Sequence, residues 1–318
     1  MWGRLPPLLS APFVISDGVF ISPKYRHTRL NAEEAFNPDG SLDAVCRRTI
    51  RIHDARSLTP APSIEREGFQ LIEAPVDLDF GDPAQVNGIY RKHCEHLVKT
   101  ATGCQSAEAV QHGFRAGRAL GPAGQGLYGV GAHADHSPMI EDFVDVPEGQ
   151  HFALFNIWRG TNPDRNIESG PLALCDRSTV SADDIVYADC LRRSEPRTRV
   201  INCRLIHDAG QIWYYFPQMK PGEALIFKQY DSRLEHAASR TVFHTAFQDP
   251  TTPEDAPLRE SVEVRVVAVL PETDPDREGR KARFQAEVPS RRLDGTVSTW
   301  CQEPEVDWSY SGSRSRLP

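Results

Sequence analysis

The feature that most constrains the fold is a run of short β-type segments between residues 150 and 272, with no helical pattern between them. Each segment is rich in β-branched and aromatic residues and is bounded by turn residues, which is typical of strands. Such a set usually closes its edges as a jelly roll. We therefore predict a mainly β protein with flanking helices, a double-stranded β-helix of the jelly-roll or cupin-like type. The segments are HFALFNIWR, PLALCD, IVYADC, TRVINCRLI, QIWYYFP, EALIFKQY, TVFHTAF and SVEVRVVAVL.

Two turn signals divide this region further. The residues from His207 to Gly210 predict a hairpin turn between the fourth and fifth segments. Pro221 and Gly222 predict another reversal before the sixth segment.

The clearest helical pattern lies earlier, between residues 82 and 103. Asp82 is a suitable N-cap, Pro83 suits the first helical position, and Gly103 ends the pattern. The residues that recur at three- and four-residue spacing should pack one face of this helix on a sheet. They are Val86, Ile89, Tyr90, His93, Leu97 and Val98.

The chain predicts one large domain with extensions. We expect an N-terminal extension over residues 1–47, a main domain over 48–272 and a polar C-terminal extension over 273–318. Within the main domain, residues 48–124 supply flanking strands and the helix, and residues 125–272 form the β-helix core. The C-terminal extension should be loosely packed, because its apolar residues are isolated.

Charge and composition exclude several classes. A net charge of -8 and a pI near 5.8 argue against binding of nucleic acid, which needs clustered Lys and Arg. No apolar run is long enough for a membrane span. Prolines interrupt the apolar N-terminal stretch, so we do not expect a signal peptide. Seven cysteines without a CxxC pair fit free thiols in a reducing compartment, so we expect a cytosolic protein.

A His-x-acid triplet is the first candidate for chemistry, because two histidines and one carboxylate form the facial triad that holds Fe(II). About 1.5 such triplets are expected by chance in this composition, and the chain has two. His93 and Glu95 lie in the predicted helix, where residues two apart point about 200° away from each other. His133 and Asp135 lie in an extended segment, where residues two apart share a face. His136, which follows directly, should face the other way.

The second histidine of such a triad must come from the β-rich region. Candidates are His207 in the predicted turn, His236 in a loop and His244 in a strand. An oxygenase that uses 2-oxoglutarate also needs a cation for the far carboxylate of that cosubstrate, ideally an Arg with a hydroxyl beside it. Arg259 and Ser261 supply this pair, and they follow His244 in the chain. This order of a strand histidine and then the Arg-x-Ser pair favours His244 over the other two histidines. Taken singly, residues of each of these types more often have a structural role than a functional one.

The sequence also resembles the fungal hydroxylase/desaturase family of gibberellin desaturase and aspergillic acid hydroxylase, and more distantly the bacterial cephamycin methoxylase subunit. The resemblance covers residues 48–270 and is carried by IHDAR, KTATG, FNIWRG, PLALCD, YYFPQMKPGEALIFKQYDSR and HTAFQDPTTPEDAPLRESVEVR. It implies an oxygenase of secondary metabolism that uses Fe(II) and 2-oxoglutarate to hydroxylate or desaturate a small molecule. The family's metal ligands would fall on His133, Asp135 and His244, and its cosubstrate pair on Arg259 and Ser261.

Further residues are weaker candidates for binding. Arg265 shares a strand face with Arg259 and is a second candidate for the cosubstrate. Trp158, Arg159 and Tyr215 lie on strands that could line a substrate pocket, and Arg159 is the first of them to test.

Two other functions fit the same residues. One is a binding subunit without activity of its own, which would act with a partner protein; an intact triad disfavours it. The other is a zinc hydrolase that uses the same three ligands, which would leave Arg259 and Ser261 without a role. We expect a small-molecule substrate and dioxygen as partners, and a homo-oligomer or a partner subunit is compatible with the sequence.

Overall fold

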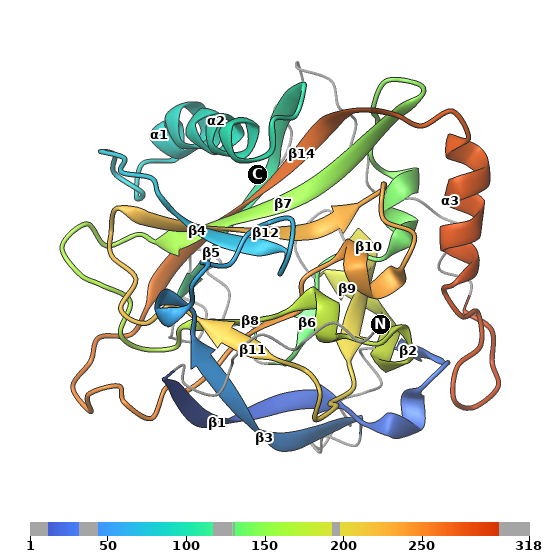
Figure 1. Ribbon diagram of the computed structural model, residues 1–318, viewed down its shortest axis with the longest axis horizontal. Coiled ribbons are helices and arrows are strands. Elements are labelled where there is room, and N and C mark those ends of the chain that lie inside the picture. The colour runs from blue at the N-terminus through green and yellow to red at the C-terminus, as the bar shows by residue number, and fades with distance from the viewer. Residues whose placement is uncertain (1–11, 32–43, 117–128, 130, 193–197, 299–318) are drawn as a thin grey trace.

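The chain folds into two β-sheets that face each other (Figure 1). The computed structural model describes residues 12–31, 44–116, 129, 131–192 and 198–298. The five-stranded sheet has the order β4 (Phe69–Glu73), β12 (Glu223–Asp231), β7 (Gln150–Gly160), β14 (Glu260–Thr273) and β5 (Ser106–Ala116). The nine-stranded sheet has the order β1 (Phe13–Ile21), β3 (Val45–Asp54), β11 (Trp213–Tyr215), β8 (Leu172–Cys175), β13 (His244–Ala246), β6 (His133–Ala134), β10 (Thr198–Leu205), β9 (Ile185–Arg192) and β2 (Arg29–Asn31).

An apolar interior joins the two sheets. Side chains alternate between the faces of a strand, so every second residue points inward. Phe69, Leu225 and Phe227 of the five-stranded sheet meet Leu174 and Tyr214 of the nine-stranded sheet in one buried cluster. Burial of each such side chain contributes about 1.5–3 kcal/mol. The predicted double-stranded β-helix is confirmed, and all eight predicted segments contain a strand.

A helical segment covers the outer face of the five-stranded sheet (Figure 1). It runs through α1 (Pro83–Gln85), a π-helical stretch (Val86–Tyr90) and α2 (Arg91–Thr102). Asp82 caps its start through the Ala84 N–H, and Gly103 ends it in the left-handed conformation, as predicted. Ile89 was predicted to be packed but is 56% exposed. The π-helical turn shifts the helical phase at this position, so Ile89 leaves the buried face.

The predicted hairpin at residues 207–210 is wrong. β10 and β11 flank this turn but do not pair with each other. β10 pairs with β6 and β9, whereas β11 pairs with β3 and β8. The turn residues are correctly located, but strand partners are chosen by the closure of the whole barrel rather than by the local turn.

Structure extends into both predicted extensions. β1 and β2, which lie within residues 1–47, pair with β3 and β9 of the nine-stranded sheet. Within residues 273–318, α3 (Arg277–Ala286) packs through the buried side chains of Arg280 and Phe284. Arg280 donates to Glu141 and, at 2.8 Å, to Asp274, so buried charges anchor this helix.

The remaining helical turns are short. They are η2 (Pro23–Tyr25), η3 (Ala55–Ser57), η5 (Pro138–Asp142), η6 (Arg177–Thr179), η7 (Ala182–Asp184) and η8 (Ala237–Arg240). Across the described ranges, none of the helices is both long enough and apolar enough to span a membrane.

Candidate metal centre

Three side chains from the nine-stranded sheet converge on one point. His133 on β6 lies directly opposite His244 on β13, and their ring centroids are 4.4 Å apart. Asp135 follows β6, and its Oδ1 lies 3.7 Å from Nε2 of His133. One ligand atom from each of the three residues lies within 4.8 Å of the other two. The structure therefore brings together the three residues that the sequence selected.

Backbone carbonyls set the tautomer of both histidines. Nδ1 of His133 lies 2.8 Å from the Gly131 carbonyl oxygen, and Nδ1 of His244 lies 3.3 Å from that of Val242. A carbonyl oxygen only accepts, so each Nδ1 carries a proton, and in the neutral ring the lone pair is therefore on Nε2. Burial, and then the neighbouring His244, lower the pKa of His133 to about 3. His133 is therefore neutral at physiological pH, as a metal ligand must be.

The carboxylate of Asp135 is fixed on one side by donors. Its Oδ2 accepts from Nδ2 of Asn156 at 2.9 Å and from Arg265 at 2.8 Å (Nη2) and 3.2 Å (Nε). The Asp135 N–H donates to Oε1 of Gln229 at 2.7 Å. Burial alone would raise the pKa of Asp135, but Arg265 and the nearby histidines hold it well below its ordinary value. The ionised Oδ1 therefore remains directed toward the histidines.

The donor set fits a divalent transition metal. Two neutral imidazoles and one carboxylate are the protein ligands of the facial triad of non-haem Fe(II) enzymes. Outer hydrogen bonds that orient each ligand, as found here, are the usual support of such a site. Three protein ligands leave coordination positions for exogenous groups.

The predicted cosubstrate residues lie at the start of β14. Arg259 is buried, donates to the Gly170 carbonyl, and places its Cζ 5.1 Å from the centroid of the Trp158 ring. The Ser261 hydroxyl is fully buried and has no hydrogen-bond partner among the described residues. Such a group normally has a partner, so Ser261 fits a site that an exogenous oxygen atom completes.

Arg265 has a different position. Besides Asp135, it donates to Glu263 at 3.0 Å and to Gln111 at 2.5 Å. Its guanidinium is therefore already engaged by two carboxylates and one amide. Arg265 is thus tied to a candidate metal ligand, whereas Arg259 lies beside the Trp158 ring.

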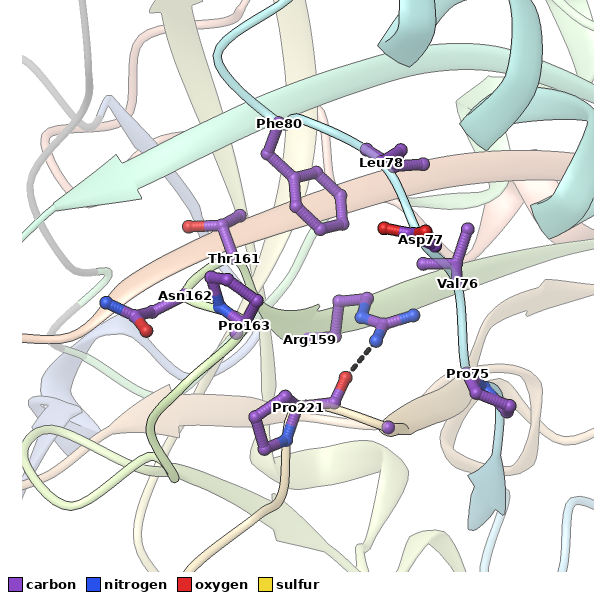
Figure 2. Close-up of a pocket in the computed structure, with 12 residues that line it drawn as sticks. Pro75, Val76, Asp77, Leu78, Phe80, Arg159, Thr161, Asn162, Pro163 and Pro221 are labelled. Carbon is purple, nitrogen blue, oxygen red and sulfur yellow. Dashed lines mark hydrogen bonds between the residues drawn. The ribbon is translucent and has the colours of Figure 1, made fainter.

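The three predicted pocket residues do not share one site. Trp158 faces the interior between the sheets. Arg159, the next residue on β7, points to the opposite face and lines a separate cavity of about 200 Å³ (Figure 2). Tyr215 lies in the apolar cluster on the outer side of the nine-stranded sheet, 5.2 Å from the Phe247 ring. Because side chains alternate between the two faces of a strand, Arg159 and Tyr215 point away from the triad.

Of the other candidate histidines, His93, His207 and His236 lie away from the triad, and His136 lies beside it. His93 is on α2, and His207 packs edge-on against Phe20 with centroids 5.1 Å apart. His236 is exposed at the start of η8. His136 is buried next to Asp135 and contributes to the low pKa of that carboxyl.

Sequence reasoning missed Asn156 and Gln229, which hold Asp135. Both are fully buried amides: Asn156 lies between Phe155 and Ile157 on β7, and Gln229 lies between Lys228 and Tyr230 on β12. A buried amide in such a strand needs a hydrogen-bond partner. For Asn156, which is flanked by apolar residues on both sides, this was the signal that could have identified it.

Comparisons with known proteins place the chain in a family. The family described as "YDMC: Oxidoreductase/YMDC permease-like domain" matches residues 22–269. The chain belongs to this family. The match begins in the N-terminal part of the nine-stranded sheet and ends within β14, so it contains the triad.

Two curated fungal proteins illustrate the relationship. The Fe(II)/2-oxoglutarate-dependent dioxygenase nvfI of Aspergillus novofumigatus is 29% identical over 236 residues, which cover 68% of this chain and 81% of that protein. The hydroxylase/desaturase asaB of Aspergillus flavus is 31% identical over 149 residues, which cover 42% of this chain and 64% of that protein. The predicted resemblance to fungal hydroxylase/desaturases, and with it the prediction of an oxidoreductase, is confirmed.

A solved structure has the same fold. The iron and alpha-ketoglutarate-dependent endoperoxidase NvfI superposes with a TM-score of 0.67 at 24% identity. The superposition covers 81% of this chain and 98% of NvfI. This likeness independently supports the double-stranded β-helix.

Proposed function

We propose that the protein is an oxygenase that depends on Fe(II) and 2-oxoglutarate and hydroxylates or desaturates a small molecule of secondary metabolism. The observation that carries this proposal is the convergence of one ligand atom each from His133, Asp135 and His244 within 4.8 Å of one another. The names of nvfI and asaB, which specify a dioxygenase and a hydroxylase/desaturase, support it.

The ligand residues have separate tasks. His133, Asp135 and His244 would hold the metal through two Nε2 atoms and one carboxylate oxygen. The bound metal, together with 2-oxoglutarate and dioxygen, would supply the oxidising power that removes hydrogen from a substrate carbon. Arg265 keeps Asp135 ionised, and the Gly131 and Val242 carbonyls keep both imidazoles in the ligating tautomer.

Arg259, Ser261 and Trp158 would form the cosubstrate end of the site. The guanidinium of Arg259 can donate two parallel bonds to the distal carboxylate of 2-oxoglutarate. The Ser261 hydroxyl supplies a further donor, and the Trp158 ring beside Arg259 keeps water from the charged pair. Water exclusion strengthens the ion pair because the local dielectric falls.

The direct test is a turnover assay with Fe(II), 2-oxoglutarate and dioxygen. We expect succinate to form only when all three are present, and chelation of the metal to stop it. A zinc hydrolase at the same site would need neither dioxygen nor 2-oxoglutarate. Succinate formation that requires a second protein would instead indicate the partner-dependent subunit.

Replacement of Arg259 tests the cosubstrate assignment. Arg259→Leu should raise the KM for 2-oxoglutarate by about 10–100-fold, because a charge-assisted bond of ~1.5–3 kcal/mol is lost. Iron affinity should stay near that of the wild type. A titration of 2-oxoglutarate in the succinate assay measures the KM, and calorimetry measures the affinity for iron. An unchanged KM would remove Arg259 from the site.

We also propose that the protein acts in the cytosol on a small molecule, without nucleic acid. The cysteines described by the structure are all free thiols, which suits a reducing compartment. Fractionation of expressing cells would test the compartment.

A further inference from the structure

A cavity lies beside Arg159 at the end of β7 (Figure 2). Trp158, the preceding residue, packs on the opposite face of this strand, in the cluster between the sheets. The volume of the cavity is about 200 Å³, and it is bordered by the segment that precedes α1, the end of β7 and the turn before β12. Val76, Leu78, Phe80 and Pro163 make its walls largely apolar.

Arg159 is the cation of this cavity. Its side chain is 2% exposed, donates to the Ala74 carbonyl at 2.7 Å and to the Pro221 carbonyl, and lies 5.8 Å from the Phe80 ring centroid. Its Nε has no hydrogen-bond partner within the described part of the chain, and the two acceptors of its guanidinium are backbone carbonyls rather than carboxylates. A buried charge without a counter-ion is costly, so the cavity favours an anion.

The groups next to Arg159 do not supply a negative charge. The Tyr90 hydroxyl and Nε2 of His93 are buried without hydrogen-bond partners in the described ranges. Burial raises the pKa of Tyr90, while burial and then Arg159 lower that of His93, so both are neutral at pH 7. Neither residue lines the cavity, so a counter-charge for Arg159 does not come from them.

The residues at the rim of the cavity limit how much negative charge a bound ligand can carry. Asp77 lines the cavity and is exposed. Its carboxylate repels a bound anion, and it repels a doubly charged one more strongly than a monocarboxylate. The volume lies below the ~300–1,000 Å³ of ordinary ligand sites, which limits the ligand to a small molecule.

We infer that this cavity is a second ligand site, which binds a small monocarboxylate with an apolar body. The carboxylate would accept from Arg159, whose planar fork suits it. The body would pack on Phe80, Val76 and Leu78. This inference does not depend on the proposed oxygenase activity, because no residue of the cavity belongs to the triad.

Calorimetry of the full chain with benzoate tests this site. We expect benzoate to bind with a Kd on the order of 1 mM, and neutral benzamide and inorganic phosphate to bind at least about tenfold more weakly. Arg159→Met should weaken benzoate at least about tenfold, since a charge-assisted bond is lost. Asp77→Asn should tighten it about threefold through the removed repulsion.

Arg259→Met is the matched control, because it removes a buried arginine on the other face of the same sheet. Benzoate binding should survive it. Loss of binding in Arg259→Met with retention in Arg159→Met would place benzoate in the cosubstrate site and overturn the inference. Absence of binding at about 10 mM benzoate, or phosphate binding as tight as benzoate, would also overturn it. If Arg159→Met fails to fold, the Asp77→Asn result decides, and unchanged affinity there counts against the site.

Discussion

His244→Ala is expected to lower the rate of succinate formation by about 1,000-fold or more, which corresponds to ~4 kcal/mol of transition-state stabilisation. His244 lies opposite His133 on paired strands and supplies one of three ligand atoms. Two remaining ligands cannot hold the metal in a fixed geometry, and residues that act as one unit lose nearly all activity when one is removed. Iron bound per chain should fall with the rate. The assay and metal analysis of the purified protein measure both.

His236→Ala is the matched control for this prediction. His236 is an exposed histidine eight residues before His244, and its replacement should leave rate and iron content unchanged. Because His244 is buried, the melting curve of His244→Ala must be recorded beside the assay. A folded His244→Ala protein with normal iron content and turnover would show that the triad is not the metal centre.

Arg265→Met is expected to lower the free energy of unfolding of the metal-free protein by about 3–5 kcal/mol. Asp135 is 9% exposed, and Arg265 makes two hydrogen bonds to its Oδ2. Removing Arg265 leaves a buried carboxylate with Asn156 as the remaining side-chain donor to that oxygen. Methionine fills similar space, so the loss reflects charge rather than a cavity. Urea unfolding in the presence of a chelator measures the difference.

Arg66→Met is the matched variant, because it removes an arginine from an exposed ion pair instead of a buried one. Arg66 is about half exposed and contacts Glu67 at 3.2 Å. Exposed ion pairs contribute only ~0–1 kcal/mol, so this change should be nearly neutral. Equal losses from the two variants would mean that the pair of Arg265 and Asp135 contributes no more than a surface contact.

Local pattern was sufficient for the strands and for the ligand candidates. The β-type segments from residue 150 onward, and the helix capped by Asp82, follow from side-chain type and period. Alternation in an extended segment also separates His133 and Asp135 from the helical pair His93 and Glu95. These inferences hold because they concern residues within a few positions of each other.

The tertiary structure decided which of these parts meet. In the folded protein, β11 pairs with β3 and β8 rather than with β10. Arg265 forms an ion pair with Asp135. Arg159 points away from Trp158 and lines a separate cavity. The fold also brings the amides of Asn156 and Gln229 into hydrogen bonds with Asp135. The sequence alone determined the strand segments between residues 150 and 272, the helix capped by Asp82 and the chemistry of the candidate ligands. The partners of each side chain depended on contacts between distant residues, which form only when the two sheets close.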